Sequence, residues 1–142
     1  MTIRRILEGR DSSVLTCEAS MSVRGAVALL SERRIGALPV LDGGSVIGIF
    51  SERDLIYKLA GSGLDALDSQ VRSVMTSPAV TVEPDTSVLA ALSLMTRRRI
   101  RHLPVIEEGQ LTGFVSIGDL VKYRIDMIES EAEAMRSYIQ MA

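Results

Sequence analysis

The sequence predicts an α/β fold: two copies of one β-α-β-β-α unit, packed with pseudo-two-fold symmetry, followed by an extended C-terminal helix. Residues 14–58 align with residues 79–123 without a gap, and 17 of the 45 pairs are identical. The strand, helix and turn signals also follow the same order in both copies. Because one unit is too short to bury a core alone, we expect the copies to pack face to face and to form matching clefts.

Each copy begins with a β-prone run, residues 14–17 and 80–82, which we expect to form a strand. Ser20 and Asp85 follow at the places where a helix N-cap is expected. Apolar side chains then recur at helical spacing, and arginines suit the negative end of each helix. The apolar positions are Val23, Ala26, Val27 and Leu30 in the first copy, and Val88, Ala91, Leu92 and Met95 in the second.

A β-hairpin is predicted next in each copy, because two apolar runs flank a turn rich in glycine and acidic residues. Ser51 and Ser116 then begin a second helix. The paired runs are residues 38–41 with 46–50, and residues 103–106 with 111–115.

The chain divides into five parts on this interpretation. They are an N-terminal segment (1–13), the first repeat (14–59), a connector (60–74), the second repeat (75–125) and a C-terminal helix extension (126–142). The last helix is expected to run from about Gly118 towards the end of the chain. Its apolar residues are spaced by four and three, which is a heptad pattern. That stripe either packs on its own domain or forms a dimer interface.

Composition excludes several classes of protein. The 16 basic and 18 acidic residues give a net charge of −2, which does not favour a general nucleic-acid binder. No apolar run approaches the roughly 20 residues that span a bilayer, and the N-terminus lacks the apolar core of a signal peptide. We therefore expect a cytoplasmic protein without a membrane span. Cys17 is the only cysteine, so no internal disulfide forms, and we expect it to be a small core residue.

Both copies place a serine at a helix start and an aspartate three residues later: Ser51 with Asp54, and Ser116 with Asp119. The structural interpretation is a capping arrangement, in which serine and aspartate bind free backbone amides. The functional interpretation uses the same geometry, because such an aspartate can accept hydrogen bonds from two vicinal hydroxyls and a helix start favours phosphate. The glycine three residues before each serine either lets a ligand approach the backbone or belongs to the hairpin.

The copies differ where the first hairpin strand begins. Arg101 and His102 in the second copy replace Gly36 and Ala37 in the first, and Arg97–Arg99 come just before. Arginine can bind phosphate through two parallel hydrogen bonds, but on charge alone a solvated helix end with an exposed strand entry is the favoured interpretation. His102 is the only histidine, which excludes a multi-histidine metal site. No nucleophile–base pair, phosphate-binding glycine loop or metal-ligand cluster is present, so we expect no enzyme, no catalytic residues and no metal.

These motifs resemble those of the cystathionine-β-synthase (CBS) domain family, whose repeats form a tandem pair called a Bateman module. The resemblance is carried by IGALPV and GIFSERDL in the first copy, and by VMTSPAVTVEPDTSV, IRHLPV and GFVSIGDL in the second. It covers residues 14–59 and 75–125. The first copy departs from the family pattern at Ala19-Ser20-Met21, where the usual Pro-Asp-Thr is missing.

The resemblance implies a stand-alone regulatory module with two ligand sites, each joining the serine and aspartate of one repeat to the strand entry of the other. Family members commonly bind AMP, ADP, ATP, NAD or S-adenosylmethionine there. The site that we call the Asp54 site would comprise Ser51, Arg53, Asp54, Val80, Ile100, Arg101, His102 and Pro104. The Asp119 site would comprise Leu15, Ile35, Pro39, Ser116 and Asp119.

The resemblance also assigns roles in the Asp54 site. Asp54 would hold the ribose hydroxyls, the backbone of Val80 would read the adenine edge, and Ile100 and Pro104 would line the base. The side chains that would face phosphate are Arg53, Arg101 and His102. The Asp119 site has no counterpart of that arginine and histidine, so we expect it to bind phosphate less well or to take a less charged ligand.

The sequence thus predicts an energy-sensing module that binds an adenine nucleotide, forms a homodimer and acts through an unidentified effector protein. A rival prediction is a structural dimerisation module that has lost its ligand. A third, less favoured, is nucleic-acid binding through the Arg97–Arg101 cluster, which the acidic balance and the few aromatic residues oppose.

Overall fold

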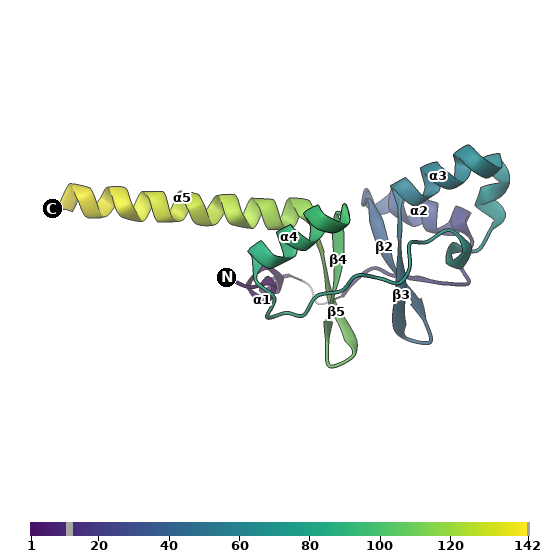
Figure 1. Ribbon diagram of the computed structural model, residues 1–142, viewed down its shortest axis with the longest axis horizontal. Coiled ribbons are helices and arrows are strands. Elements are labelled where there is room, and N and C mark those ends of the chain that lie inside the picture. The colour runs from purple at the N-terminus through teal and green to yellow at the C-terminus, as the bar shows by residue number, and fades with distance from the viewer. Residues whose placement is uncertain (11–12, 142) are drawn as a thin grey trace.

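The computed structural model describes residues 1–10 and 13–141; residues 11–12 of the predicted N-terminal segment, and Ala142, lie outside the described residues. The chain forms two similar halves (Figure 1). Their β-hairpins lie next to each other, with contacts between β3 (Ser45–Ser51) and β5 (Gln110–Ser116), and the helices cover the outer sides. The predicted α/β fold of two packed repeats with a C-terminal helix is confirmed.

The first half contains a three-stranded sheet in the order β1-β2-β3. β1 (Cys17–Glu18) pairs in parallel with β2 (Ala37–Asp42), which pairs antiparallel with β3. Helices α2 (Val23–Arg33) and α3 (Glu52–Ser62) pack on this sheet. The opening strand is shorter than predicted, because residues 14–16 make no strand pairing.

The second half repeats this order with a weaker opening strand. β4 (His102–Glu107) and β5 form an antiparallel pair, flanked by α4 (Val88–Arg98) and α5 (Ile117–Met141). The predicted strand at residues 80–82 is reduced to one parallel bridge between Val82 and Val105. Both halves thus follow the predicted sequence of elements.

The helix caps differ from the prediction. Ser22 and Ser87, not Ser20 and Asp85, are the N-caps of α2 and α4. The hydroxyl oxygen of Ser22 accepts a 3.0 Å hydrogen bond from the amide of Gly25, and Ser87 does the same three residues before Ala90. Ser20 and Asp85 lie in the turn that precedes each cap, so they cannot reach the helix amides.

Segments outside the two repeats complete the cores. The N-terminal helix α1 (Ile3–Leu7) buries Ile3 completely among apolar side chains of the second repeat. The connector folds into two 3₁₀ turns, η1 (Gly63–Asp68) and η2 (Val71–Ser73), and buries Val71 in the core of the first repeat. Each core is therefore closed by the segment that precedes the other repeat.

Cys17 occupies the core position predicted for it. Its side chain is 3% exposed within the first repeat's core, and burial raises the pKa of the thiol to about 11. The thiol is therefore protonated at neutral pH and resists reaction.

α5 begins against its own half and then leaves it. Its first part contacts α4, α1 and β5, and Leu120 is fully buried. The rest projects from the body as a single rod (Figure 1). Its heptad stripe is exposed, so packing on its own domain is not the explanation of that stripe. No helix in the described part of the chain is long and apolar enough to cross a membrane.

Candidate functional site between the two repeats

Two cavities lie between the halves, and each contains one of the Ser-x-x-Asp pairs. The cavity around Asp54 has a volume of about 560 Å³ and the cavity around Asp119 about 570 Å³. Volumes of this size suit small-molecule ligands. Each cavity joins the helix start of one repeat to the strand entry of the other, which is the arrangement that the family resemblance implied.

Asp54 is both a capping residue and part of a cavity wall. Its Oδ2 atom accepts hydrogen bonds from the backbone amide of Ser51 (2.9 Å) and from the Ser51 hydroxyl (3.1 Å). The amide of Asp54 donates back to the Ser51 hydroxyl oxygen at 3.4 Å, which completes a capping box at the start of α3. Its Oδ1 atom accepts a 2.7 Å hydrogen bond from the hydroxyl of Thr76. Because each carboxylate oxygen can accept more than one hydrogen bond, the cap leaves Asp54 able to accept further donors.

Several basic side chains and one further acid, Glu52, line the Asp54 cavity. Arg53 lines it and donates a 3.3 Å hydrogen bond from its guanidinium to the backbone carbonyl of Arg99, which joins α3 to the end of α4. Apolar side chains line the cavity as well, notably Val80 and Ile100. The other basic residues of the wall are Arg98, Arg99, Arg101 and His102.

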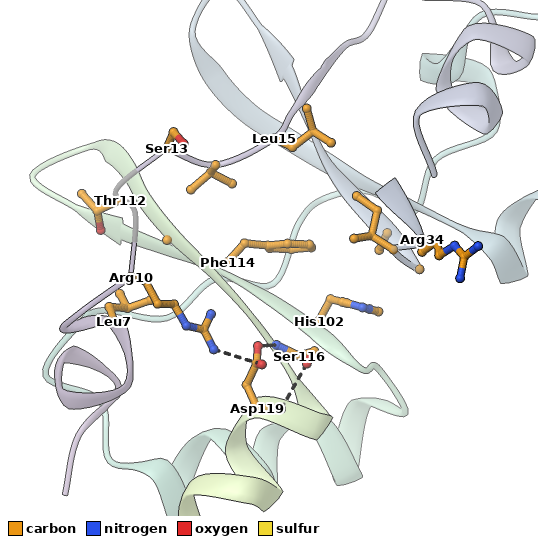
Figure 2. A pocket seen from close by; sticks show the side chains of 15 residues that line it. Leu7, Arg10, Ser13, Leu15, Arg34, His102, Thr112, Phe114, Ser116 and Asp119 are labelled. Carbon is orange, nitrogen blue, oxygen red and sulfur yellow. Dashed lines mark hydrogen bonds and ion pairs between the residues drawn. The ribbon is translucent and has the colours of Figure 1, made fainter. Parts of the chain in front are cut away.

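The Asp119 cavity has the same helix cap, but a different side chain contacts the free oxygen of its aspartate (Figure 2). The amide of Ser116 donates to Asp119 Oδ2 at 2.8 Å, and the amide of Asp119 donates back to the Ser116 hydroxyl at 3.1 Å. The guanidinium of Arg10 lies 3.0 Å from Asp119 Oδ1, where the other cavity has a threonine hydroxyl. Arg34 also lines this cavity. Sequence comparison of the repeats could not find Arg10, which precedes the aligned region.

His102 belongs to the walls of both cavities. Its ring stacks on Phe114, with centroids 5.4 Å apart and planes inclined by 17°. Burial lowers the pKa of His102, and Arg101 acts in the same direction, whereas Asp119 and Glu52 oppose the change. The ring is therefore mainly neutral at pH 7. At that pH it can form hydrogen bonds but contributes little positive charge to either cavity.

The hairpin glycines have a structural role. A Cβ atom on Gly113 would lie 2.7 Å from a methyl carbon of Leu7, and one on Gly48 would lie 2.7 Å from the sulfur of Met75 and 2.8 Å from the carbonyl oxygen of Thr76. Leu7 of the N-terminal helix fills the space beside Gly113, and Met75 and the backbone of Thr76 fill the space beside Gly48. Gly48 does not line the Asp54 cavity, but Gly113 does line the Asp119 cavity, so approach of a ligand to the backbone stays a prediction for Gly113.

Most residues predicted for the two sites meet in the two cavities. Pro104 and Pro39 do not line them, since each is buried within its strand. Those that line the Asp54 cavity are Ser51, Arg53, Asp54, Val80, Ile100, Arg101 and His102. Those that line the Asp119 cavity are Leu15, Ile35, Ser116 and Asp119. That these residues bind a ligand stays a prediction.

Among residues 1–10 and 13–141, no three His, Cys, Asp or Glu side chains come together as metal ligands would. The polar groups that line the cavities include carboxylates, which accept hydrogen bonds, guanidinium groups, which donate them, and hydroxyls, which do both; these suit an organic ligand with hydroxyl and anionic groups.

Comparison with known proteins identifies the class. Residues 10–61 and 71–126 match the CBS domain family, so the chain belongs to that family and carries a tandem pair. The CBS domain-containing protein CBSX3, mitochondrial, of Arabidopsis thaliana is 37% identical over 135 residues, which are 92% of this chain and 66% of that protein. This chain thus spans about two thirds of that plant relative's length.

Solved structures share the fold. A CBS-domain-containing protein from Agrobacterium tumefaciens is 37% identical, with a TM-score of 0.83 over 87% of this chain and 92% of its own. The crystal structure of CBSX2 in complex with AMP is 26% identical, with a TM-score of 0.74 over 89% of this chain and 97% of that one. A relative of this chain therefore binds AMP.

Proposed function

We propose that this protein is a regulatory module that binds an adenosine-containing ligand, of the AMP, ADP, ATP or NAD type, in the clefts between its CBS repeats. The observation that carries the proposal is the Asp54 cavity, in which a carboxylate at a helix start and several basic side chains line one space of about 560 Å³. The AMP complex of CBSX2 supports the ligand class. No catalytic role is proposed.

The chemistry of the cavity suits a nucleotide. The two hydroxyls of a ribose donate to Asp54, which accepts both while it caps α3. The phosphate meets the positive end of α3 together with Arg53 and Arg101. The base lies against the apolar side chains of Val80 and Ile100. Arg98, Arg99 and Arg101 line this cavity, which favours a nucleotide site over the nucleic-acid patch considered for that cluster.

The test is calorimetric titration of AMP, ATP and NAD into the parent protein and into Asp54→Asn. Asparagine keeps an acceptor for the cap but loses the charge, so the loss of hydrogen bonds to a charged group predicts roughly 10- to 150-fold weaker binding at that cavity. Asp126→Asn on the exposed part of α5 is the control, and thermal melts check that both variants fold. If Asp54→Asn binds every nucleotide as tightly as the parent, the assignment is wrong.

The rival function, a dimerisation module without a ligand, has its own supporting observations: the exposed stripe of α5, and Arg10 paired with the aspartate of one cavity. Thermal melts with a panel of adenine compounds separate the two. A ligand present at a concentration of about 100 times its dissociation constant stabilises the native state by roughly 2.7 kcal/mol. The melting temperature then rises by several degrees. No rise with any compound favours the rival.

Assembly and location complete the proposal. We propose a homodimer, since the α5 stripe offers an apolar surface, and an effector protein that reads the state of the clefts. A cytoplasmic location remains a prediction; the name of the Arabidopsis relative places that protein in mitochondria.

A further inference from the structure

The unpartnered part of α5 carries a continuous apolar stripe. Ile125 is 50% exposed, Met135 62% and Ile139 66%. The C-terminal part of the helix projects from the body of the protein (Figure 1). A stripe of large apolar side chains on a lone rod is unfavourable in water and marks an interaction surface. The full stripe is Val121, Ile125, Ile128, Ala132, Met135 and Ile139.

The stripe fits the core positions of a coiled coil. Ile125, Ala132 and Ile139 occupy the a positions, and Val121, Ile128 and Met135 occupy the d positions.

The charges beside the stripe select the partner and its direction. The g positions hold Arg124 and Glu131, and the e positions hold Glu129 and Arg136. In a parallel, in-register pair, a g residue faces the partner's e residue five positions further along. Arg124 then faces the partner's Glu129, and Glu131 faces the partner's Arg136. Both pairs are oppositely charged, and the two-fold axis repeats each of them.

The antiparallel alternative is less favourable. An antiparallel pair that overlaps the whole stripe has its two-fold axis beside Ser130. Glu129 then lies close to Glu129 of the second copy, and Glu131 lies close to Glu131 of the second copy. Both pairs bring like charges together, which is unfavourable. The surface of α5 is thus complementary to itself in the parallel direction.

We propose that α5 forms a parallel, in-register, two-stranded coiled coil with α5 of a second copy of this chain. The inference deepens the proposed homodimer and does not depend on nucleotide binding. It places both copies of the CBS pair at the same end of the rod.

Cysteine cross-linking tests the direction of pairing. Equivalent d residues face each other across a parallel pair at a separation that suits a disulfide, so Met135→Cys is expected to give a covalent dimer under mild oxidation. Ser130→Cys is the matched control, because its f position points away from the partner and should not cross-link. Cys17 gives no background, since it is buried. In an antiparallel pair Met135 meets residue 125 of the partner instead, so a dimeric Met135→Cys protein that does not cross-link overturns the proposal.

Charge exchange tests the pairing residues. Glu129→Arg places a positive charge opposite Arg124 of the second copy. The dissociation constant of the dimer is therefore expected to rise severalfold. Adding Arg124→Glu restores opposite charges and is expected to restore the parent's dissociation constant. If the double variant is no tighter than the single one, the proposed contact is wrong.

Truncation after Tyr123 separates this inference from the ligand proposal. The shortened chain keeps Asp119 and the buried Leu120, so nucleotide binding should persist. Light scattering should report a lower mass than for the parent. A parent that is already monomeric, or a truncated chain of unchanged dimer mass, overturns the coiled coil whatever the cavities bind.

Discussion

The aspartates of the two cavities differ in the side chain that binds their Oδ1 atom. Thr76 donates a hydroxyl hydrogen to Asp54, a bond that a ligand hydroxyl can share or replace at little cost. Arg10 forms an ion pair with Asp119, whose side chains are 38% and 32% exposed. A ribose that binds Asp119 must share it with Arg10 or displace it, and the displaced guanidinium is then free to meet a phosphate. We therefore expect the Asp119 cavity to favour phosphorylated ligands over uncharged ones. This replaces the expectation from sequence that the Asp119 site binds phosphate less well, because Arg10, Arg34 and His102 line this cavity.

Arg10→Gln tests this preference. It removes the ion pair while keeping a polar chain, so adenosine is expected to bind the Asp119 cavity more tightly and AMP to lose its advantage over adenosine. Exposed ion pairs are worth roughly 0.2–1 kcal/mol, which predicts an affinity change of up to about fivefold. Calorimetry in an Asp54→Asn background confines the measurement to this cavity.

The control for that experiment is Arg5→Gln, whose ion pair with Glu8 lies on the exposed side of α1 away from both cavities. An unchanged ratio of AMP to adenosine affinity in Arg10→Gln would mean that Arg10 plays no part in ligand choice.

At the scale of elements, the hairpins are held by segments that sequence patterns did not identify. Leu7 at the end of α1 packs on Gly113 of β5, and Met75, just after the connector, packs on Gly48 of β3. The amide and carbonyl of Ile49 also bind the backbone of Thr76, at 3.0 and 2.9 Å. Gly48 of the first hairpin is therefore contacted by both a side chain and the backbone of the neighbouring segment. Gly113 of the second hairpin is contacted by a side chain alone.

Alanine at these glycines should destabilise the protein unequally. Gly48→Ala meets the fixed carbonyl oxygen of Thr76 at 2.8 Å, whereas Gly113→Ala meets only the end of Leu7, which can rotate away. We expect a loss in unfolding free energy of about 2–3 kcal/mol for Gly48→Ala and about 1 kcal/mol for Gly113→Ala. Urea unfolding followed by circular dichroism measures both. Equal losses would show that the backbone contact is not the cause.

The elements that could be predicted from sequence are those with a strong internal period. The hairpins and helices α2 to α5 follow from apolar spacing and from the repeat. The caps were misplaced by two residues, because Ser20 and Asp85 are as suitable chemically as Ser22 and Ser87 and only the preceding turn decides between them. Helix α1 could not be predicted, since its five residues are stabilised by burial of Ile3 in a distant core and not by local propensity.

At the scale of the whole molecule, the candidate site was predictable because it lies between equivalent faces of a repeat. The repeat predicted a seam with matching features from both halves, and the family resemblance implied that Asp54 faces the segment with Ile100, just before β4. The groups that break the symmetry were not predictable, because Arg10 and Thr76 come from segments outside the aligned residues. The prolines of the I-x-x-L-P-V motif were assigned to the cavities although Pro39 and Pro104 are buried within their strands.

The exchange of closing segments makes the two halves mutually dependent. Ile3 closes the second core and Val71 closes the first, and both side chains are fully buried. Their backbones are held in the same way, by bridges from Thr2 to Ser87 and from Gln70 to Ser22. Loss of either side chain should therefore lower the unfolding free energy of both halves together.

Ile3→Ala and Val71→Ala test this dependence. Removing a buried isoleucine is expected to cost about 2–5 kcal/mol, and removing two methyl groups of valine about 2 kcal/mol. Both variants should still unfold in one transition, shifted to lower urea concentration, whereas Arg5→Ala on the exposed face of α1 should stay within about 0.5 kcal/mol of the parent. Two separate transitions in Ile3→Ala, with the first repeat unfolding as in the parent, would mean that the halves are independent and that α1 stabilises only the core it enters.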